Sequence, residues 1–193
     1  MTSGPVPSFH AFTTKARGLA RRIVTPASIG PAFDPRNPPV PPSPQLAVQA
    51  LWDTGATGSV ITAATAASLH LVPMGVVTVN HAGGSSLVNT YVVSITLPNQ
   101  VGVAAVQVSE CPDGAGQFDA IIGMDVITLG DLSISNLNGQ TWMTFRIPSV
   151  EAVDFVREAD RLTYSGVPRN APCPCGKLRP DGQPIKFKHC HGA

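Results

Sequence analysis

The first feature of this sequence that could do chemistry is an aspartate placed directly after an apolar strand. Residues 46–52 predict a largely buried strand, and residues 59–62 resume β-branched, apolar character after a turn. Asp53 therefore lies where the strand meets a tight turn formed by Thr54 and Gly55, and we expect its carboxylate to be held rigidly and partly desolvated. The plainer interpretation is that Asp53 only forms the turn or caps a helix, which is a common role of aspartate before glycine.

A second motif, far along the chain, strengthens the chemical interpretation. Residues 53–57 (Asp-Thr-Gly-Ala-Thr) and residues 121–125 (Ile-Ile-Gly-Met-Asp) together resemble the signatures of single-domain, retroviral-type (retropepsin-like) aspartic proteases. The resemblance implies that Asp53, Thr54 and Gly55 are catalytic residues and that Ala56 contacts substrate. In that family the threonine hydroxyl forms a hydrogen bond across a dimer, and the glycine lets the substrate backbone approach.

The chemistry of this family requires two carboxylates. One activates a water molecule, and the other, protonated, donates a hydrogen bond to the scissile carbonyl. The chain has one Asp-Thr-Gly triplet, and the Asp-Gly pairs at 113–114 and 181–182 lack a buried strand before them. The simplest solution is a homodimer in which Asp53 of each chain meets its copy at a two-fold axis. Close like charges then make the two carboxylates share one proton.

Two further segments have counterparts in the resembled family. Residues 79–87 occupy the interval of the hairpin that closes over the peptide, with Gly83 and Gly84 as its substrate-contacting tip, although Gly-Gly is also a good turn in any hairpin. We interpret His81 as solvent-facing or close to substrate, not as catalytic. Asp125 could be taken for the missing second carboxylate, but we favour a helix-start role, because an acidic residue is stabilised in the first turn. Met124 replaces an arginine of the viral members.

The C-terminal tail contains a second candidate site. Three of the four cysteines lie in it, and their clustering favours a metal over disulfides. Residues 168–177 and 186–192 resemble the two halves of a SEC-C type zinc motif. This resemblance implies a structural Zn²⁺ bound by Cys173, Cys175, Cys190 and His191. His189 is the competing nitrogen ligand. The plainer alternative is a disordered basic tail that happens to contain cysteines. The wide interval between Cys175 and Cys190 implies an inserted loop around residues 178–184.

Composition limits the partners and the location. The chain of 193 residues is 13% charged with a formal net charge of +1, which suggests neither nucleic acid nor membrane as a partner. No apolar run approaches the ~20 residues that span a bilayer. Since no apolar segment of a secretory signal is found either, a reducing cytoplasm is the expected compartment. Composition alone leaves a mitochondrial-type presequence open.

The fold class that we predict is all-β. We expect a flexible, Pro-rich segment at 1–44 with an edge strand at 22–30, and a retropepsin-like closed barrel at 45–148. The barrel would contain one short helix at 63–70 behind Thr62 and a hairpin turn at 138–139. Residues 149–165 would follow as a helix and linker. The helix runs from Ser149 to Leu162, and its apolar stripe would pack on the barrel or in a dimer. A zinc module at 166–193 would end the chain.

These features together predict a cytoplasmic, homodimeric aspartic endopeptidase that cleaves peptide or protein substrates and needs no cofactor for catalysis. Its zinc-stabilised tail would dock a protein partner. The alternative from another class is a noncatalytic module that keeps the protease fold for peptide binding or dimerisation. The tail alone suggests a third use, in quality control of nascent or exported chains.

Overall fold

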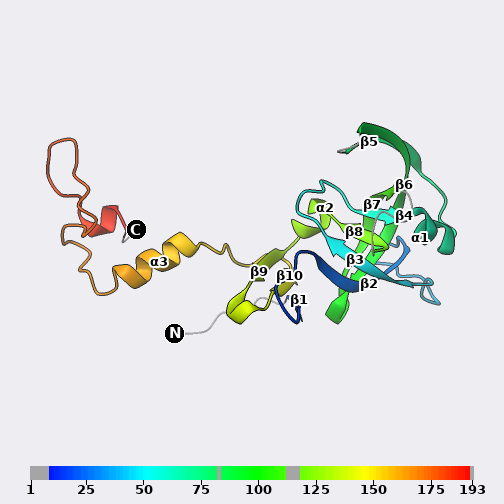
Figure 1. The fold of residues 1–193 in the computed structure, drawn as a ribbon, viewed down its shortest axis with the longest axis horizontal. Coiled ribbons are helices and arrows are strands. Elements are labelled where there is room, and N and C mark those ends of the chain that lie inside the picture. The colour runs from blue at the N-terminus through cyan, green and yellow to red at the C-terminus, as the bar shows by residue number, and fades with distance from the viewer. Residues whose placement is uncertain (1–8, 82–83, 112–117, 192–193) are drawn as a thin grey trace. The chain divides into compact units, whose positions relative to one another are not determined.

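The computed structural model describes residues 9–81, 84–111 and 118–191. Their chain divides into two compact units, one ending at Val150 and the other beginning at Glu151. The first unit contains almost all of the β structure, and the second contains one helix and a short tail (Figure 1). No helix among the described residues has both the length and the apolar character needed to cross a bilayer.

The first unit is built around a closed barrel, which confirms the predicted fold class. Its sheet has the order β2-β3-β8-β4-β7-β6-β5, and a further pairing between β2 and β6 closes six of these strands into a ring. The bounds are β2 (Ile23–Pro31), β3 (Leu46–Trp52), β4 (Val60–Thr62), β5 (Gly75–His81), β6 (Gly84–Leu97), β7 (Val101–Cys111) and β8 (Ala120–Ile122). Alternating burial along β3 directs every second side chain into the core.

The core of this unit is apolar and tightly enclosed. Its interior is filled by side chains that are at most 1% exposed, namely Ile29, Ala50, Ile61, Val93, Ile95, Val101, Val108, Ile122, Val126, Met143 and Phe145. Most of them are β-branched, which suits a pleated surface packed on one face.

A smaller sheet lies beside the barrel and has the order β1-β10-β9. Its strands are β1 (His10–Lys15), β9 (Asp131–Ser135) and β10 (Trp142–Ile147). Phe12 of β1 and Phe145 of β10 pack against Trp52 of β3, with ring centroids 6.0 and 5.0 Å from that of Trp52. Aromatic packing therefore joins the two sheets near the end of the strand that leads to Asp53.

The N-terminal segment differs from the prediction of a flexible arm. Residues 10–15 pair along their whole length with β10, and β2 hydrogen-bonds to both β3 and β6. Pro26 is tolerated because β6 pairs only with the second half of β2, from Ser28 to Pro31, so the missing N–H of the proline disrupts no second ladder. Residues 32–45 form no helix or strand, in agreement with the predicted Pro-rich loop.

The short helices follow local capping chemistry. Helix α1 (Ala63–Ser68) begins behind Thr62, whose hydroxyl accepts a hydrogen bond from the Thr65 N–H, as predicted. Helix α2 (Met124–Ile127) follows β8. Single 3-10 turns lie at η1 (Pro98–Gln100), η2 (Leu137–Gly139) and η3 (Phe187–His189). In η2, Asn138 and Gly139 both have positive φ, at 53° and 72°, which matches the predicted turn between β9 and β10.

The predicted C-terminal helix is shorter than expected. Helix α3 spans Phe155–Thr163, and its N-cap is Asp154, whose carboxylate accepts hydrogen bonds from the N–H groups of Val156 and Arg157. Ser149, the expected start, instead donates its hydroxyl hydrogen to the Asp131 carboxylate. The helix contains no buried residue. It groups with the tail into one unit, whereas the sequence analysis had assigned it to a linker at 149–165.

The β5–β6 hairpin has the position that was predicted for the substrate-covering hairpin. The two strands pair from Gly75 opposite Thr90 to His81 opposite Gly84, and they extend beyond the barrel (Figure 1). Gly84 has a φ of 121°, a backbone conformation that favours glycine. Gly83, the other predicted tip residue, lies outside the described residues.

Candidate active site and candidate metal centre

Asp53 occupies the strand-to-turn position that its sequence indicates. Its backbone N–H, just past the end of β3, donates to the Ile122 carbonyl of β8 at 3.0 Å. Its side-chain Oδ1 accepts a hydrogen bond from the Gly55 N–H at 2.8 Å. Asp53 is half-buried, and Thr54 and Gly55 are exposed. The turn thus fixes the carboxylate while leaving the triplet open at the surface of this unit.

The second motif supports this turn from behind. Gly123 follows β8, and a Cβ placed on it would lie 2.5 Å from the backbone of Gly58, a contact that side chains do not make. The Met124 N–H donates to the Ala56 carbonyl at 2.8 Å. A glycine is therefore required at 123 so that β8 and α2 can pack directly against the loop that carries Asp53.

Ser59 and Asp125 complete this support through an interaction that the sequence did not indicate. The Asp125 carboxylate accepts hydrogen bonds from the Ser59 N–H at 2.9 Å and from its hydroxyl at 2.7 Å. The Ser59 Oγ in turn accepts from the Gly123 N–H at 3.1 Å. Asp125 lies in the first turn of α2, as predicted, but both of its oxygens bind the loop. These contacts make it a support of the loop, not a second catalytic carboxylate.

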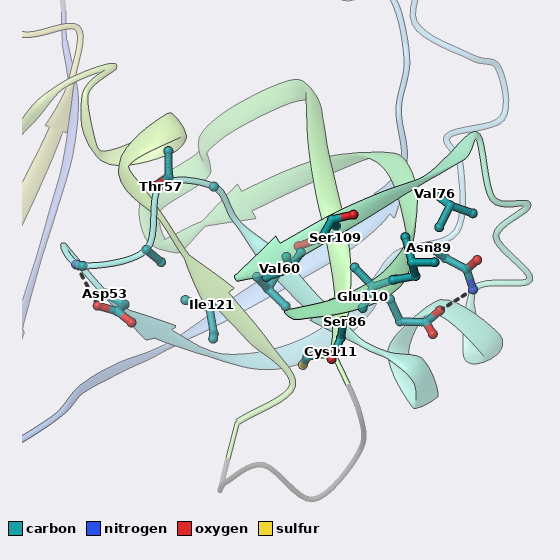
Figure 2. A pocket seen from close by; sticks show the side chains of 17 residues that line it. Asp53, Thr57, Val60, Val76, Ser86, Asn89, Ser109, Glu110, Cys111 and Ile121 are labelled. Atoms are coloured by element: carbon teal, nitrogen blue, oxygen red, sulfur yellow. Dashed lines mark hydrogen bonds between the residues drawn. The ribbon is translucent and has the colours of Figure 1, made fainter. Parts of the chain in front are cut away.

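An elongated cleft of about 1230 Å³ begins at Asp53. Figure 2 shows Asp53 at one end of the lining and Glu110 toward the other. The described lining residues are Asp53, Gly55, Ala56, Thr57, Gly58, Val60, Val76, Thr78, Val79, Ser86, Leu87, Val88, Asn89, Ser109, Glu110, Cys111 and Ile121. The cleft brings together the predicted residues Asp53, Gly55 and Ala56, with walls from β5 and β6. Thr54 and Gly84 are not among its lining residues.

Glu110 was not singled out by sequence reasoning. It is the only acidic residue of β7, and its Oε2 accepts hydrogen bonds from the Tyr91 hydroxyl and, at 3.3 Å, from the Asn89 amide. Burial, followed by the hydrogen bond and charge of Glu110, raises the pKa of Tyr91. The available signal was a single charge at the end of an otherwise apolar strand, next to residues that line the cleft.

The second unit gathers the four predicted metal ligands. The Sγ atoms of Cys173, Cys175 and Cys190 and a ring nitrogen of His191 all lie within 4.8 Å of one another. The His191 Nδ1 is 3.3 Å from the sulfurs of both Cys173 and Cys190, and the Cys175 and Cys190 sulfurs are 3.6 Å apart. A tetrahedral zinc shell with Zn–S bonds of about 2.3 Å has S–S edges of about 3.8 Å, so the spacing fits zinc. His189 is not part of the cluster.

The electrostatics of the cluster also favour a cation. Desolvation, followed by the neighbouring Cys175 and Cys173, raises the pKa of Cys190 to about 11. Hydrogen bonding to the Lys177 backbone N–H, followed by smaller effects of the neighbouring thiols, lowers the pKa of Cys175. Thiols packed this closely oppose one another's ionisation, and a bound Zn²⁺ would remove that opposition by holding them as thiolates.

Helix α3 contributes to this centre. The His191 Nε2 faces the Asp160 carboxylate, with Oδ2 at 3.7 Å, which leaves Nδ1 as the nitrogen directed at the thiols. Tyr164 stacks on the His191 ring with centroids 4.6 Å apart and also contacts Phe187 at 6.0 Å. The helix and the tail therefore form one small structure around the four candidate ligands.

A closed barrel with an Asp-Thr-Gly turn at one end of a cleft is the arrangement expected of a retropepsin-like aspartic protease domain. Residues 45–126 match the family model described as "Aspartyl protease". The fold is similar to a retropepsin-like aspartic protease from Rickettsia conorii (10% identity, TM-score 0.45, 74% of this chain and 98% of that chain). It is also similar to the retroviral protease-like domain of Ddi1 from Leishmania major (17% identity, TM-score 0.39, 60% and 82%). The family match and the site geometry support this class for residues 45–126.

One match concerns a different kind of protein. A stretch of 43 residues is 56% identical to the protein translocase subunit SecA of Granulibacter bethesdensis. It covers 22% of this chain and 4% of that relative, so the likeness is confined to a small module. Together with the four clustered ligands, the match fits a zinc motif of the SEC-C type.

Proposed function

We propose that the first unit is one half of an aspartic endopeptidase, completed by a second copy of the chain. The observation that supports this most directly is the Asp53 turn, which is held from behind by Gly123 and lies at one end of the cleft. Because the exposed Thr54 and Gly55 flank the carboxylate, a two-fold partner can bring its own Asp53 beside it. The pair would then share one proton.

The reaction then follows from the two carboxylates. The ionised member accepts a proton from a water molecule as the water oxygen attacks the peptide carbonyl carbon, and the protonated member donates a hydrogen bond to the carbonyl oxygen. The carbon–nitrogen bond breaks when a carboxyl group delivers a proton to the leaving amine. Since catalysis needs one ionised and one protonated carboxylate, we expect the best activity at acidic to mildly acidic pH.

Peptide cleavage by the wild type and by Asp53→Asn tests this function. The amide is nearly isosteric but cannot activate water, so we expect kcat/KM to fall at least ~1000-fold with an unchanged circular dichroism spectrum. Equal cleavage by both proteins would end the protease proposal. Peptide binding without cleavage in the wild type would instead support the noncatalytic peptide-binding module.

A mixing experiment tests the shared site. If the chains exchange freely, an equal mixture of wild type and Asp53→Asn leaves only about a quarter of the dimers with two aspartates, so activity per wild-type chain should fall to about half. Activity per wild-type chain that does not change on mixing would show that one chain suffices.

For the second unit we propose one structural Zn²⁺ per chain, bound by Cys173, Cys175, Cys190 and His191. Four protein ligands close the shell, so the ion would shape the module and leave no position for a reactant. Lys177, Arg179 and Lys186 are exposed on the module, which suits the docking of an acidic protein partner. Free thiols of this kind require a reducing compartment, which is why we place the protein in the cytoplasm.

A further inference from the structure

The end of the cleft away from Asp53 carries a second carboxylate. Glu110 lies near the end of β7, is half-buried and lines the cleft (Figure 2). Nothing in the mechanism above uses it. A charged group that is partly removed from water needs compensation, so its surroundings indicate what it is for.

The described residues hydrogen-bond to one oxygen of this carboxylate. The Tyr91 hydroxyl and the Asn89 amide both donate to Oε2. Because the pKa of Tyr91 is raised, the phenol keeps its proton and stays a donor at neutral pH. Within the described residues, the hydrogen bonds of this carboxylate end on Oε2, which leaves Oε1 for a ligand in the cleft. The two donors thus fix the orientation of the group.

The described lining of the cleft supplies no Lys or Arg side chain to balance the charge of Glu110. The sequence has neither residue type between Arg36 and Arg146. Asn89 and Tyr91 supply neutral hydrogen bonds but no positive charge. A positively charged ligand group would therefore gain both a charge-assisted hydrogen bond and the field of an acidic domain.

The strand register gives the distance between the two carboxylates. Leu51, Ile121, Val60 and Ser109 lie side by side on β3, β8, β4 and β7. Asp53 and Glu110 lie just beyond the first and the last of these residues. Because β7 runs opposite to β3, the two residues lie on opposite sides of this row. Three steps between neighbouring strands, each of about 4.8 Å, and an offset of three residues along the strands, each of about 3.3 Å, place them roughly 15–18 Å apart. This separation excludes a catalytic pair, and it matches a side chain a few residues along an extended peptide, which rises about 3.3 Å per residue.

We propose that Glu110 determines substrate specificity by binding a lysine or arginine side chain three to five residues from the scissile bond. The inference rests on the proposed endopeptidase function, since it places an extended peptide in the cleft. A two-fold dimer presents one Glu110 on each side of the Asp53 pair. Peptides with a basic residue on both sides of the cleaved bond are therefore the preferred class of substrate.

The test uses the full chain and peptides that share an apolar cleavage site. Their third to fifth residues on either side carry lysine, norleucine, which is apolar and uncharged, or glutamate. We expect the wild type to cleave lysine peptides ~10-fold to 100-fold better in kcat/KM than norleucine peptides, which is the range of a charge-assisted hydrogen bond. Glu110→Gln should remove this preference and change norleucine peptides less than twofold. Glu158→Gln, which removes an exposed carboxylate of α3, is the matched control.

Each outcome decides the inference. Equal cleavage of lysine and norleucine peptides by the wild type would overturn the inference. An equal loss of cleavage of both peptides in Glu110→Gln would also overturn it, because it would show that Glu110 has a purely structural role. Binding of the same peptides to Asp53→Asn, measured by fluorescence anisotropy, separates this inference from the proposed function. If no peptide is cleaved but lysine peptides bind in a Glu110-dependent way, the specificity stands and the protease proposal fails. If lysine peptides show no Glu110-dependent preference in binding either, the inference fails.

Discussion

The two units of this chain are stabilised by different means. The barrel unit encloses a continuous apolar core, from Phe12 of β1 to Phe145 of β10. In the second unit, the buried residues among those described are Cys173 and Phe187. A unit of about 40 residues with so little buried apolar surface does not reach stability by the hydrophobic effect alone. The comparison indicates that the barrel is stabilised by apolar burial, whereas the tail would need the proposed ion.

Removal of the metal should have the largest effect and should affect only the second unit. Since the four ligands belong to the second unit, chelation of zinc should unfold residues 151–191 completely while the barrel keeps its structure. Hydrogen exchange resolved along the chain measures both units at once. Loss of barrel protection on chelation, or protein purified without chelator that contains no zinc, would contradict the division.

The same division predicts the effect of single cysteine substitutions. Cys190→Ser should lose zinc and still cleave peptides at the wild-type rate. Cys111→Ser lies in β7, outside the cluster, and should retain one zinc per chain as the matched control. A Cys190→Ser protein that binds zinc as tightly as the wild type would remove Cys190 from the ligand set.

A substitution in the barrel unit should affect stability and catalysis without affecting zinc. Asp125→Ala removes the acceptor of two Ser59 hydrogen bonds, so we expect the free energy of unfolding to fall by about 2–4 kcal/mol. The loop that carries Asp53 would loosen, and kcat should fall on the order of 10-fold to 100-fold. Zinc content should not change. Asp125→Asn keeps one carbonyl acceptor, so its losses of stability and of kcat should both be smaller than those of Asp125→Ala. An Asp125→Ala protein as stable and active as the wild type would contradict this role.

The smallest effect is expected at the edge of the metal centre. The Asp160 carboxylate faces the ring nitrogen of His191 that points away from the thiols, so Asp160→Asn should weaken zinc binding ~10-fold to 100-fold. Competition with a chromophoric chelator measures this affinity directly. Glu158→Gln changes the charge of the same helix by the same amount and should leave the affinity unchanged. Equal affinities of Asp160→Asn and the wild type would show that the ring is oriented by Tyr164 alone.

Local chemistry made much of this molecule predictable from its sequence. The strand before Asp53, the Thr62 cap and the turn at Asn138 and Gly139 depend on neighbouring residues, and the structure has all three. The cysteine cluster was equally clear, since thiols at this spacing have few other uses.

The unpredicted features depend on partners far along the chain. The strand character of residues 10–15 comes from pairing with β10, and the position of Glu110 in the cleft comes from the curvature of the barrel. Helix α3 was misplaced because Ser149 resembles an N-cap, although its hydroxyl is bonded to Asp131 of β9. Propensity cannot anticipate such tertiary competition.

The pairing of β1 with β10 has a consequence for biosynthesis. His10 lies opposite Ile147, so β1 is synthesised well before β10 and lacks this partner until nearly the whole first unit has been made. Until then Phe12 and Trp52 cannot both be covered by Phe145, and the unfinished chain exposes an open strand edge. Such long-range closure slows folding.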